Sequence, residues 1–263
     1  FWDAETGEIT LADDWYVEDD RTRLSVDLKP SGSVFVMMRP QATAGVSARR
    51  RFSASREQAV PGPWNVSFAA TYPAPRPIVL ERLMTLSEHP SADIRHFSGS
   101  STYQTVLECE RAPDERIVLV LGEVKNLAEV SVNGIRFPVL WRPPFRVDIT
   151  DAVKQGMSTN ALSIRVVNLW VNRLIGDESL PSDVEWQGNA LAAIPDWVKR
   201  GEASPTGRNT FTTWHHWRKG DPLPKSGLLG PVRLMTFADD SSNGCVGHIA
   251  DPVAGMVSLY LQI

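Results

Sequence analysis

The chain has 263 residues, of which 42% are hydrophobic and 22% are charged, and this composition is ordinary for a globular protein. Its formal net charge is −4 and no apolar run approaches the ~20 residues that cross a bilayer, so neither nucleic acid nor a membrane is an expected partner. The two cysteines, Cys109 and Cys245, are too few and too far apart for a disulfide framework or a cysteine-rich zinc site.

Short apolar or alternating runs, separated by turn residues, predict an all-β chain. Helix is expected in less than about 15% of the residues, against a norm near one third. One short helical turn is expected after Thr150 or Asp151 as its cap, with Gly156 as its stop. The expected strands, in chain order, are 8–11, 23–28, 33–38, 64–68, 102–107, 116–121, 127–132, 146–149, 161–168, 232–237 and 256–263.

The dipeptide Asn133-Gly134 is the strongest hairpin signal in the chain. It stands between the alternating run "AEVSV" and the run "IRFPVL". A type I′ turn requires positive φ at both central residues, which asparagine and glycine tolerate. We therefore expect a tight antiparallel hairpin at this point.

Composition shifts along the chain divide it into four segments. Residues 1–40 are strand-like but too few to fold alone, so they are interpreted as the trailing strands of a truncated preceding β-domain. Residues 41–62 are small, polar and basic, which predicts a linker. Residues 63–237 are expected to form one antiparallel β-sandwich, and residues 238–263 are a tail of unclear role. The sequence begins without methionine, which suggests a piece of a longer protein.

Tryptophan is abundant, with nine residues against four tyrosines. A flat indole can stack on the face of a sugar ring, whereas the alternative is that these side chains fill the core of the sandwich. The candidates for sugar contact include Trp141, Trp170 and Trp214.

The stretch "TFTTWHHWRKGDPLPKSGLLGPVRL" at residues 210–234 raises the question of binding most directly. In an extended strand successive side chains point to opposite faces, so the adjacent His215 and His216 are unlikely chelators of one metal. Alternation predicts an outward face of Trp214 and His216, which is available to a ligand. The inward face is then expected to hold Phe211, Thr213, His215 and Trp217.

The stretch "NRLIGD" places Arg173 four residues before Asp177. This spacing predicts a loop pinned by a charge-assisted hydrogen bond between the two side chains. The alternative is that Asn168, Asn172 or Arg173 contacts sugar hydroxyl groups directly. Both interpretations remain open at this stage.

Two segments, "NLWVNRLIGDESLPSD" (168–183) and residues 210–234, resemble the C-terminal region of glycoside hydrolase family 106, the α-L-rhamnosidases. "FWDAETGEIT" and "SGSVFVMMRP" are similar to the strands that precede that region. The order of motifs over 97–181 resembles a galactose-binding-like jelly roll, which is also found in sugar-binding domains of family 2 enzymes. The resemblance covers roughly residues 1–237 and implies a carbohydrate partner, plausibly rhamnose-containing, and a secreted or periplasmic location.

Members of that family carry their catalytic acid and base on an (α/β)-barrel upstream, and no such alternation of strands and helices occurs in this sequence. Glycoside hydrolysis needs two carboxyl groups about 5–9 Å apart. The catalytic candidates on this scaffold are Glu88, Glu123, Asp148 and Asp177, with Asp93 and Glu178 as further acids. The alternative is that all of them are surface or turn-capping acids.

The resemblance also suggests a structural calcium ion, since jelly-roll sugar-binding domains often carry one. The loop "SEHPSADIR" offers Glu88 and Asp93 as oxygen ligands. No other cofactor is expected.

Three hypotheses follow. The leading one is a non-catalytic carbohydrate-binding or accessory region of a rhamnosidase-like glycoside hydrolase. The alternative is a small carbohydrate-active hydrolase with its own acid pair, so the sequence leaves open whether the chain is an enzyme. The third is a structural module, and exposed strand edges in residues 1–40 further predict self-association.

Overall fold

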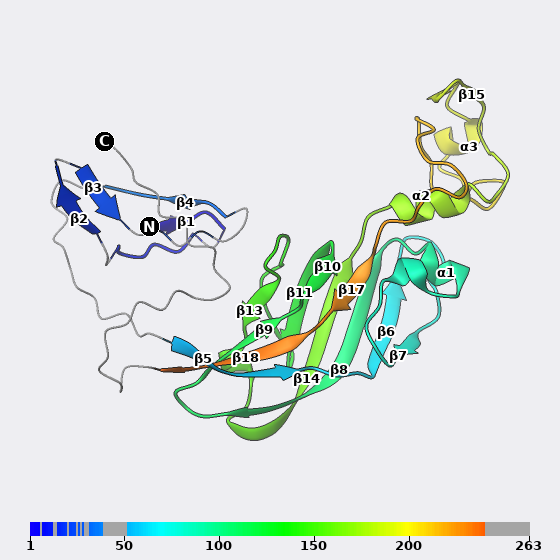
Figure 1. Cartoon of the computed structure of the whole chain (residues 1–263). Helices are drawn as coiled ribbons and strands as arrows, with labels where there is room; N and C mark the ends of the chain where they lie inside the picture. The colour runs from blue at the N-terminus through cyan, green and yellow to red at the C-terminus, as the bar shows by residue number, and fades with distance from the viewer. Residues whose placement is uncertain are drawn as a thin grey trace.

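The computed structural model describes residues 1–5, 7–12, 15–19, 21–24, 26, 28, 32–38 and 52–239 (Figure 1). Several sequence predictions lie outside these residues: Cys245, the expected strand 256–263, the tail beyond residue 239, and residues 41–51 of the expected linker. Among the described residues, 41% lie in strands and 10% in helices, which confirms the predicted all-β class.

Two antiparallel sheets form the body of the molecule. The larger has six strands. In spatial order these are β12 (Ile135–Arg136), β11 (Leu127–Val132), β14 (Gly156–Val167), β8 (Ser100–Arg111), β6 (Trp64–Ala69) and β7 (Ile78–Leu80). Its longest pairing joins β14 to β8 from Gly156 opposite Arg111 to Val167 opposite Ser100.

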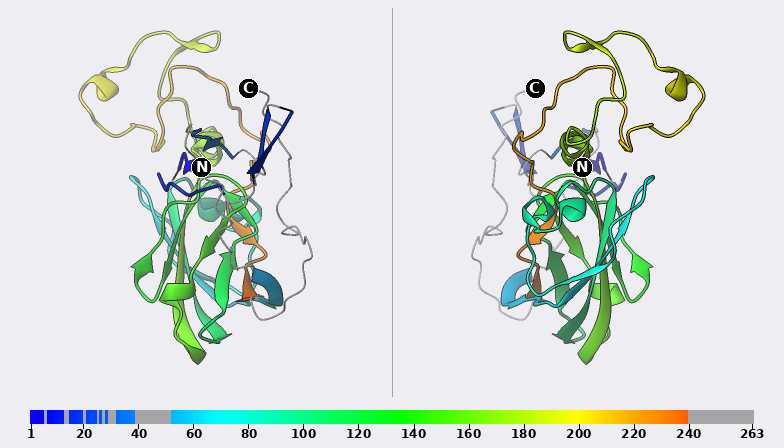
Figure 2. Two further views of the ribbon diagram at one scale, coloured as in Figure 1. Left: turned by 90° about the vertical axis from the view of Figure 1, so that its left-hand side faces the viewer. Right: turned by 90° about the vertical axis from the view of Figure 1, so that its right-hand side faces the viewer.

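The second sheet has four strands, and its order is β13 (Arg146–Asp148), β9 (Arg116–Val120), β18 (Arg233–Asp239) and β5 (Phe52–Ala59). A separate antiparallel pair joins β10 (Glu123–Lys125) to β17 (Gly227–Gly230). Figure 2 shows the sheets packed as the layers of a sandwich.

Strict alternation of side chains builds the core between the layers. On β14 the residues Leu162, Ile164 and Val166 are buried while their neighbours point outward. Ile117 and Leu119 do the same on β9 in the opposing sheet. Each fully buried aliphatic side chain stabilises the fold by about 1.5–3 kcal/mol relative to exposure, so this two-residue period fixes which face of each sheet turns inward.

The predicted Asn133-Gly134 hairpin is confirmed. Asn133 has φ of 51° and Gly134 has φ of 84°, and the turn joins β11 to β12 with Val132 opposite Ile135. The Asn133 amide also accepts a hydrogen bond from the Ala161 N–H at 2.9 Å and donates one to the Ala152 carbonyl at 2.8 Å. The side chain therefore ties the turn to the neighbouring parts of the sandwich.

Part of the linker prediction is wrong. Residues 52–59 of the predicted linker form strand β5, which pairs with β18. From Ala54 to Ala59 the side chains of β5 are exposed, because the strand lies at the edge of its sheet. Backbone pairing rather than burial holds this strand, so its polar composition resembles that of a linker.

The short helix predicted after Thr150 is a single 3-10 turn, η2 (Thr150–Ala152), and its N-cap residue is Ile149. Neither Thr150 nor Asp151 caps it, which corrects the prediction. Gly156 has φ of 71° and begins strand β14 rather than ending a helix.

The N-terminal residues form two small antiparallel pairs, β1 (Trp2–Asp3) with β4 (Val34–Phe35) and β2 (Trp15–Glu18) with β3 (Arg21–Leu24). The strand expected at 8–11 is reduced to a bridge between Ile9 and Trp2. An ion pair between Glu5 and Arg142 joins this part to the sandwich.

Helical structure is confined to short segments. Besides η2 they are η1 (Leu86–Glu88), α1 (Ala92–Arg95), α2 (Val171–Asp177) and α3 (Asp196–Lys199). Within the described ranges, none of the helices has the length and apolarity of a membrane span. The sequence analysis expected a loop where α2 lies. A Cβ at Gly176 would approach His96 Cβ to 2.7 Å, so glycine at this position allows the helix to pack closely.

Asp148, one of the catalytic candidates, instead joins β13 to β9. Its Oδ2 accepts hydrogen bonds from Arg116 Nε at 3.0 Å and Nη2 at 2.6 Å. Its Oδ1 accepts from the Thr150 N–H at 3.0 Å, and the Thr150 Oγ1 in turn accepts from the Ile117 N–H at 2.9 Å. Burial raises the pKa of the Asp148 carboxyl, but the hydrogen bonds from Thr150 and Arg116 outweigh it and the pKa falls below its ordinary value.

Replacing Asp148 with Asn is therefore expected to lower the free energy of unfolding by about 1–2 kcal/mol, because a charge-assisted contact is lost at a half-exposed site. Urea unfolding at neutral pH measures it. Asp114→Asn, in the exposed turn between β8 and β9, is the control and is expected to have little effect. Equal stability of the two variants would show that the Asp148 network contributes nothing.

Candidate functional site

A long excursion leaves the sandwich between α2 and β17, and we call residues 178–223 the lobe. It holds α3 and a hairpin of β15 (Trp186–Gln187) and β16 (Ala190–Leu191). Figure 1 shows the lobe projecting beyond α2, away from the two sheets. None of its side chains is fully buried, so an apolar core does not hold it together.

A buried carboxylate holds the lobe to α2. Asp177 is fully buried, and its Oδ2 accepts hydrogen bonds at 2.8 Å from the N–H groups of Asn209 and Thr210 and from the Thr210 hydroxyl. Its Oδ1 lies 3.0 Å from Arg173 Nη2, although the angle is not that of a hydrogen bond. The predicted Arg173–Asp177 contact is thus present, but it lies on a helix rather than in a loop. The hydrogen bonds of Asp177 go to residues 209–210 instead of to Arg173.

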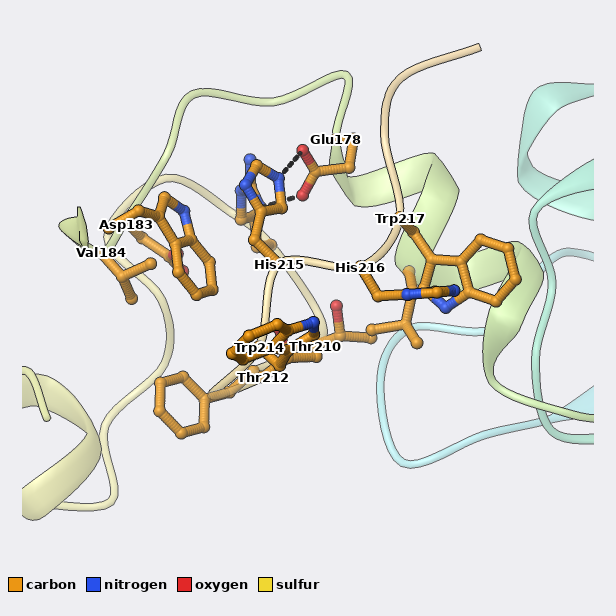
Figure 3. Close-up of a pocket in the computed structure, with 13 residues that line it drawn as sticks. Glu178, Asp183, Val184, Thr210, Thr212, Trp214, His215, His216 and Trp217 are labelled. Atoms are coloured by element: carbon orange, nitrogen blue, oxygen red, sulfur yellow. Dashed lines mark hydrogen bonds and ion pairs between the residues drawn. The ribbon is translucent and has the colours of Figure 1, made fainter. Parts of the chain in front are cut away.

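Glu178 continues the same polar connection into the lobe. Its Oε1 lies 2.9 Å from Arg208 Nη1 and its Oε2 lies 2.8 Å from His215 Nε2. Figure 3 shows His215 directed at this carboxylate. Burial raises the pKa of the Glu178 carboxyl, but hydrogen bonds from His215 and Arg208 outweigh it, and the pKa lies below its ordinary value. Glu178 is therefore an ionised partner of two basic groups.

Arg208 reaches further than the carboxylate. Its Nε donates to the Pro181 carbonyl at 2.9 Å and its Nη2 donates to the Leu180 carbonyl at 3.1 Å. The Arg208 guanidinium therefore connects residues 180–181, at the start of the lobe, to residue 208, where the chain runs back toward the sandwich. Arg208 was not among the predicted site residues, because a lone arginine in an irregular stretch carries no recognisable pattern.

His215 is fixed from a second side by an aromatic stack. The rings of His215 and Trp186 lie 4.7 Å apart with an interplanar angle of 12°. The β15–β16 hairpin positions Trp186, and the His215 N–H donates to the Asn189 carbonyl at 2.8 Å. Trp186 was also missed, although Gly188-Asn189 in its hairpin is a recognisable turn signal.

A narrow pocket opens at this network and is lined by residues of α2 and the lobe (Figure 3). Its cavity volume is about 20 Å³, which is room for about one water molecule. The lining residues are Leu174, Glu178, Asp183, Val184, Trp186, Arg208, Thr210, Phe211, Thr212, Trp214, His215, His216 and Trp217. A sugar ring does not fit inside, so a ligand here has to bind across the rim.

The predicted faces of residues 211–217 are partly correct. Trp214 is 57% exposed and His216 is exposed, as expected for the outward pair. Phe211 is 37% exposed, however, and Trp217 is only partly covered. The inward assignment fails because this segment is not a regular strand, and only Trp214 forms a bridge, to Ala190.

The two histidines make separate contacts, as their adjacency predicted. His216 lies edge-on against Trp217 with ring centroids 4.7 Å apart. Asp221, further along the same segment, accepts a hydrogen bond from the Arg218 N–H at 2.7 Å.

The other predicted binding residues lie elsewhere. Trp170 is 48% exposed at the start of α2 and lies 6.2 Å from the Tyr72 ring, and Arg173 lies over the same ring at 5.9 Å. Asn172 is buried beside the end of the lobe, where its amide donates to the Pro224 carbonyl at 2.9 Å. Trp141 is 58% exposed and lines neither pocket described for this chain.

The remaining predicted acids do not converge. Glu123 is half-exposed and lies 3.5 Å from Lys125 and 3.4 Å from Lys225. Glu88 and Asp93 are exposed on η1 and α1. In the parts of the chain that the structure describes, no three His, Cys, Asp or Glu side chains gather as a metal cluster. The calcium site predicted at Glu88 and Asp93 therefore has no third His, Cys, Asp or Glu side chain beside it among the described residues.

Comparison with known proteins shows similarity to much longer chains. No protein-family model matches the sequence. The chain is 33% identical over 231 residues to a putative beta-glucuronidase of Formosa agariphila, a match that covers 84% of this chain and 20% of that protein.

Among solved structures, a rhamnosidase from Novosphingobium sp. PP1Y matches with a TM-score of 0.54 and 36% identity over 72% of this chain and 16% of that one. A β-glucuronidase of Bifidobacterium dentium matches more weakly, with a TM-score of 0.46 and 19% identity over 71% of this chain and 30% of that one. The chain thus spans about a fifth of the length of the curated relative it matches.

The lowered pKa of Glu178 predicts a pH-dependent stability. Its contribution is present in full above the ordinary value of 4.5 and is lost as the pH falls through the lower folded pKa. Wild-type protein and Glu178→Gln should therefore differ in free energy of unfolding at neutral pH, and the difference should shrink as the pH falls below 4.5 and through the lowered folded pKa. Denaturant unfolding across pH 3–7 measures this. Glu185→Gln, an exposed acid of the same lobe, is the control, and a Glu178 difference that persists unchanged at pH 3 contradicts the assignment.

Proposed function

We propose that this chain is a carbohydrate-binding, accessory β-sandwich region of a rhamnosidase-like glycoside hydrolase, and that the lobe supplies its binding surface. One observation carries the proposal: the exposed indole of Trp214 stands at the rim of a polar network that fixes its neighbours. The similarity to two glycosidase sequences supports a carbohydrate ligand. The galactose-binding-like jelly roll and a rhamnose-containing ligand are the finer parts of the same proposal.

The chemistry of the rim suits a sugar. An indole presents a flat apolar face to the axial C–H groups of a pyranose ring, and such aromatic contacts contribute about 0.5–1.5 kcal/mol. Exposed polar groups beside Trp214, including the His216 imidazole and the Thr213 hydroxyl, offer hydrogen bonds to sugar hydroxyls. The shallow pocket favours one face of a glycan chain over a buried single sugar.

The contacts around His215 hold the surface at Trp214 in place before any ligand binds. Glu178 and Trp186 hold the His215 ring, and Arg208 holds Glu178 in turn. Trp214 and His216 are the chain neighbours of His215, so their backbone is held with it. A surface that is ordered before binding loses less conformational entropy when a ligand arrives. The polar network therefore serves binding through preorganisation.

The test of this proposal is a glycan array with wild-type protein and Trp214→Ala, followed by calorimetry on the best glycan. Trp214→Ala is expected to weaken binding about 2–10-fold, in line with an aromatic contribution of about 0.5–1.5 kcal/mol. Trp141→Ala is a matched control, because Trp141 is 58% exposed against 57% for Trp214 but lies outside the pocket. Equal losses in both variants, or no binding to any glycan, would overturn the proposal.

A second candidate, a small hydrolase, rests on one observation: Glu178 and Asp183 both line the pocket. The chemistry of Glu178 argues against it. A general acid needs a raised pKa, whereas that of Glu178 is lowered, and both of its oxygens contact basic groups. Asp183 accepts a hydrogen bond from Ser204 at 2.6 Å.

We therefore expect no measurable hydrolysis of an aryl α-L-rhamnoside by this chain. The assay compares wild-type protein with the double variant Glu178→Gln/Asp183→Asn at equal concentration. Turnover by the wild type that the double variant lacks would establish the hydrolase instead. Turnover equal in both would show that Glu178 and Asp183 do not carry it, and turnover that stays with the protein through a further purification step would overturn the non-catalytic assignment.

A further inference from the structure

A second cavity lies at the base of the lobe, beside the start of α2, whereas the pocket at Trp214 is lined by residues from the later part of α2 and from the lobe. Its volume is about 210 Å³, roughly ten times that of the lobe pocket. Its walls come from three separate parts of the chain: the end of β10, the start of α2 and the approach to β17. The lining residues are Lys125, Asn126, Leu169, Val171, Asn172, Pro224, Lys225 and Ser226.

The volume of this cavity limits the size of the ligand that it can accommodate. Its volume lies below the ~300–1,000 Å³ of pockets that enclose drug-sized ligands, yet it is large enough for several water molecules. One monosaccharide unit or a molecule of similar size matches that space, and an oligosaccharide does not. Leu169 is 56% exposed and Trp170 next to it is 48% exposed, so an apolar edge adjoins the cavity.

Asn172 gives the wall an unusual acceptor. The residue is 2% exposed, and its amide nitrogen donates to the Pro224 carbonyl at 2.9 Å and to the Ser226 hydroxyl at 3.3 Å. A carbonyl can only accept, so the NH₂ group must face Pro224 and the orientation of the amide is fixed. Its Oδ1 has no hydrogen-bond donor among the described residues. A buried acceptor without a donor costs about 1–3 kcal/mol. The oxygen itself is buried behind the cavity wall, so a ligand hydroxyl supplies the donor only if the wall around Asn172 opens slightly.

Two ammonium groups give the cavity its charge. Lys125 and Lys225 both line it, and their side chains are 40% and 56% exposed. Both contact the same carboxylate, Glu123, at 3.5 and 3.4 Å. These separations are longer than an optimal charge-assisted hydrogen bond of about 2.7–2.9 Å, and each ammonium has three donors. The group of two lysines and one glutamate carries a net charge of +1 and keeps donors for an anion.

From this combination we propose that the cavity is a binding site for one acidic sugar unit, whose carboxylate or sulfate pairs with Lys125 and Lys225 and whose hydroxyl groups face the Asn126 and Asn172 side. The inference shares with the proposed function only the idea that the ligand is a sugar. The site is distinct from the Trp214 rim, so the two can fail separately.

Calorimetric titration of the whole chain tests the proposal with two matched pairs of probes. D-glucuronate is compared with D-glucose, and D-galacturonate with D-galactose, since each pair differs only in a carboxylate against a hydroxymethyl group. At least one acid is expected to bind ~10-fold more tightly than its neutral partner, the effect of one charge-assisted hydrogen bond, and its affinity should fall with added salt. D-glucose 6-sulfate separates sulfate from carboxylate as the favoured anion. Neutral sugars that bind as well as all the acidic ones would overturn the proposal.

Titration of single-residue variants with the same acidic sugar tests whether it binds in this cavity. Lys225→Met should weaken binding of the acid ~10-fold, and Lys154→Met, an exposed lysine near the opposite end of β14, should leave it unchanged. Glu123→Gln removes the competing carboxylate and should tighten binding several-fold. Trp214→Ala should have no effect. Equal binding by Lys225→Met and wild type, or weaker binding by Glu123→Gln, would show that the acid binds elsewhere.

Discussion

One buried carboxylate, that of Asp177, is the contact on which the position of the lobe depends. It is fully buried at the end of α2, and a single oxygen accepts three hydrogen bonds from residues 209–210, more than thirty residues further along the chain. A buried charge is expensive unless it is paired and hydrogen-bonded, so these donors are needed for α2 to end as it does. Because the donors belong to the lobe, the helix and the lobe depend on each other. Glu178, the next residue, extends the connection to Arg208 and His215.

The sandwich and the lobe are therefore stabilised by different forces. The sandwich is held by apolar burial between alternating strands, which is non-directional and cooperative. The lobe has no buried side chain of its own and is held by directional polar contacts and one aromatic stack. Regions with few buried apolar contacts open locally at lower free energy than a core. The division suits a binding surface: the sandwich supplies a rigid base, and the lobe keeps Trp214 and other aromatic side chains on the outside, where a core would have covered them.

The sandwich was largely predictable because its signals are local. Alternation in 127–132 and 64–68 gave strands close to the observed β11 and β6, and Asn133-Gly134 identified its hairpin. β5 was mistaken for a linker because backbone pairing, which leaves no side-chain pattern, holds an edge strand. In the lobe, the exposure of Trp214 was predicted from strand alternation, although the segment is not a regular strand. Trp186 and Arg208 meet His215 and Glu178 across 29–30 residues of irregular chain. No periodic pattern records such contacts. The cavity at Asn172 was missed for the same reason, since its walls come from three distant segments.

The central claim is that Asp177 holds the polar lobe in its observed shape. Native-state hydrogen exchange on wild-type protein and Asp177→Ala tests it most directly, with exchange rates followed separately in the lobe and in strands β8 and β14. The account predicts that Asp177→Ala accelerates exchange across residues 186–216 while β8 and β14 keep their protection. If exchange in the lobe is unchanged, or if the sandwich and the lobe lose protection together, the lobe is not a separately held unit and Asp177 is not what holds it.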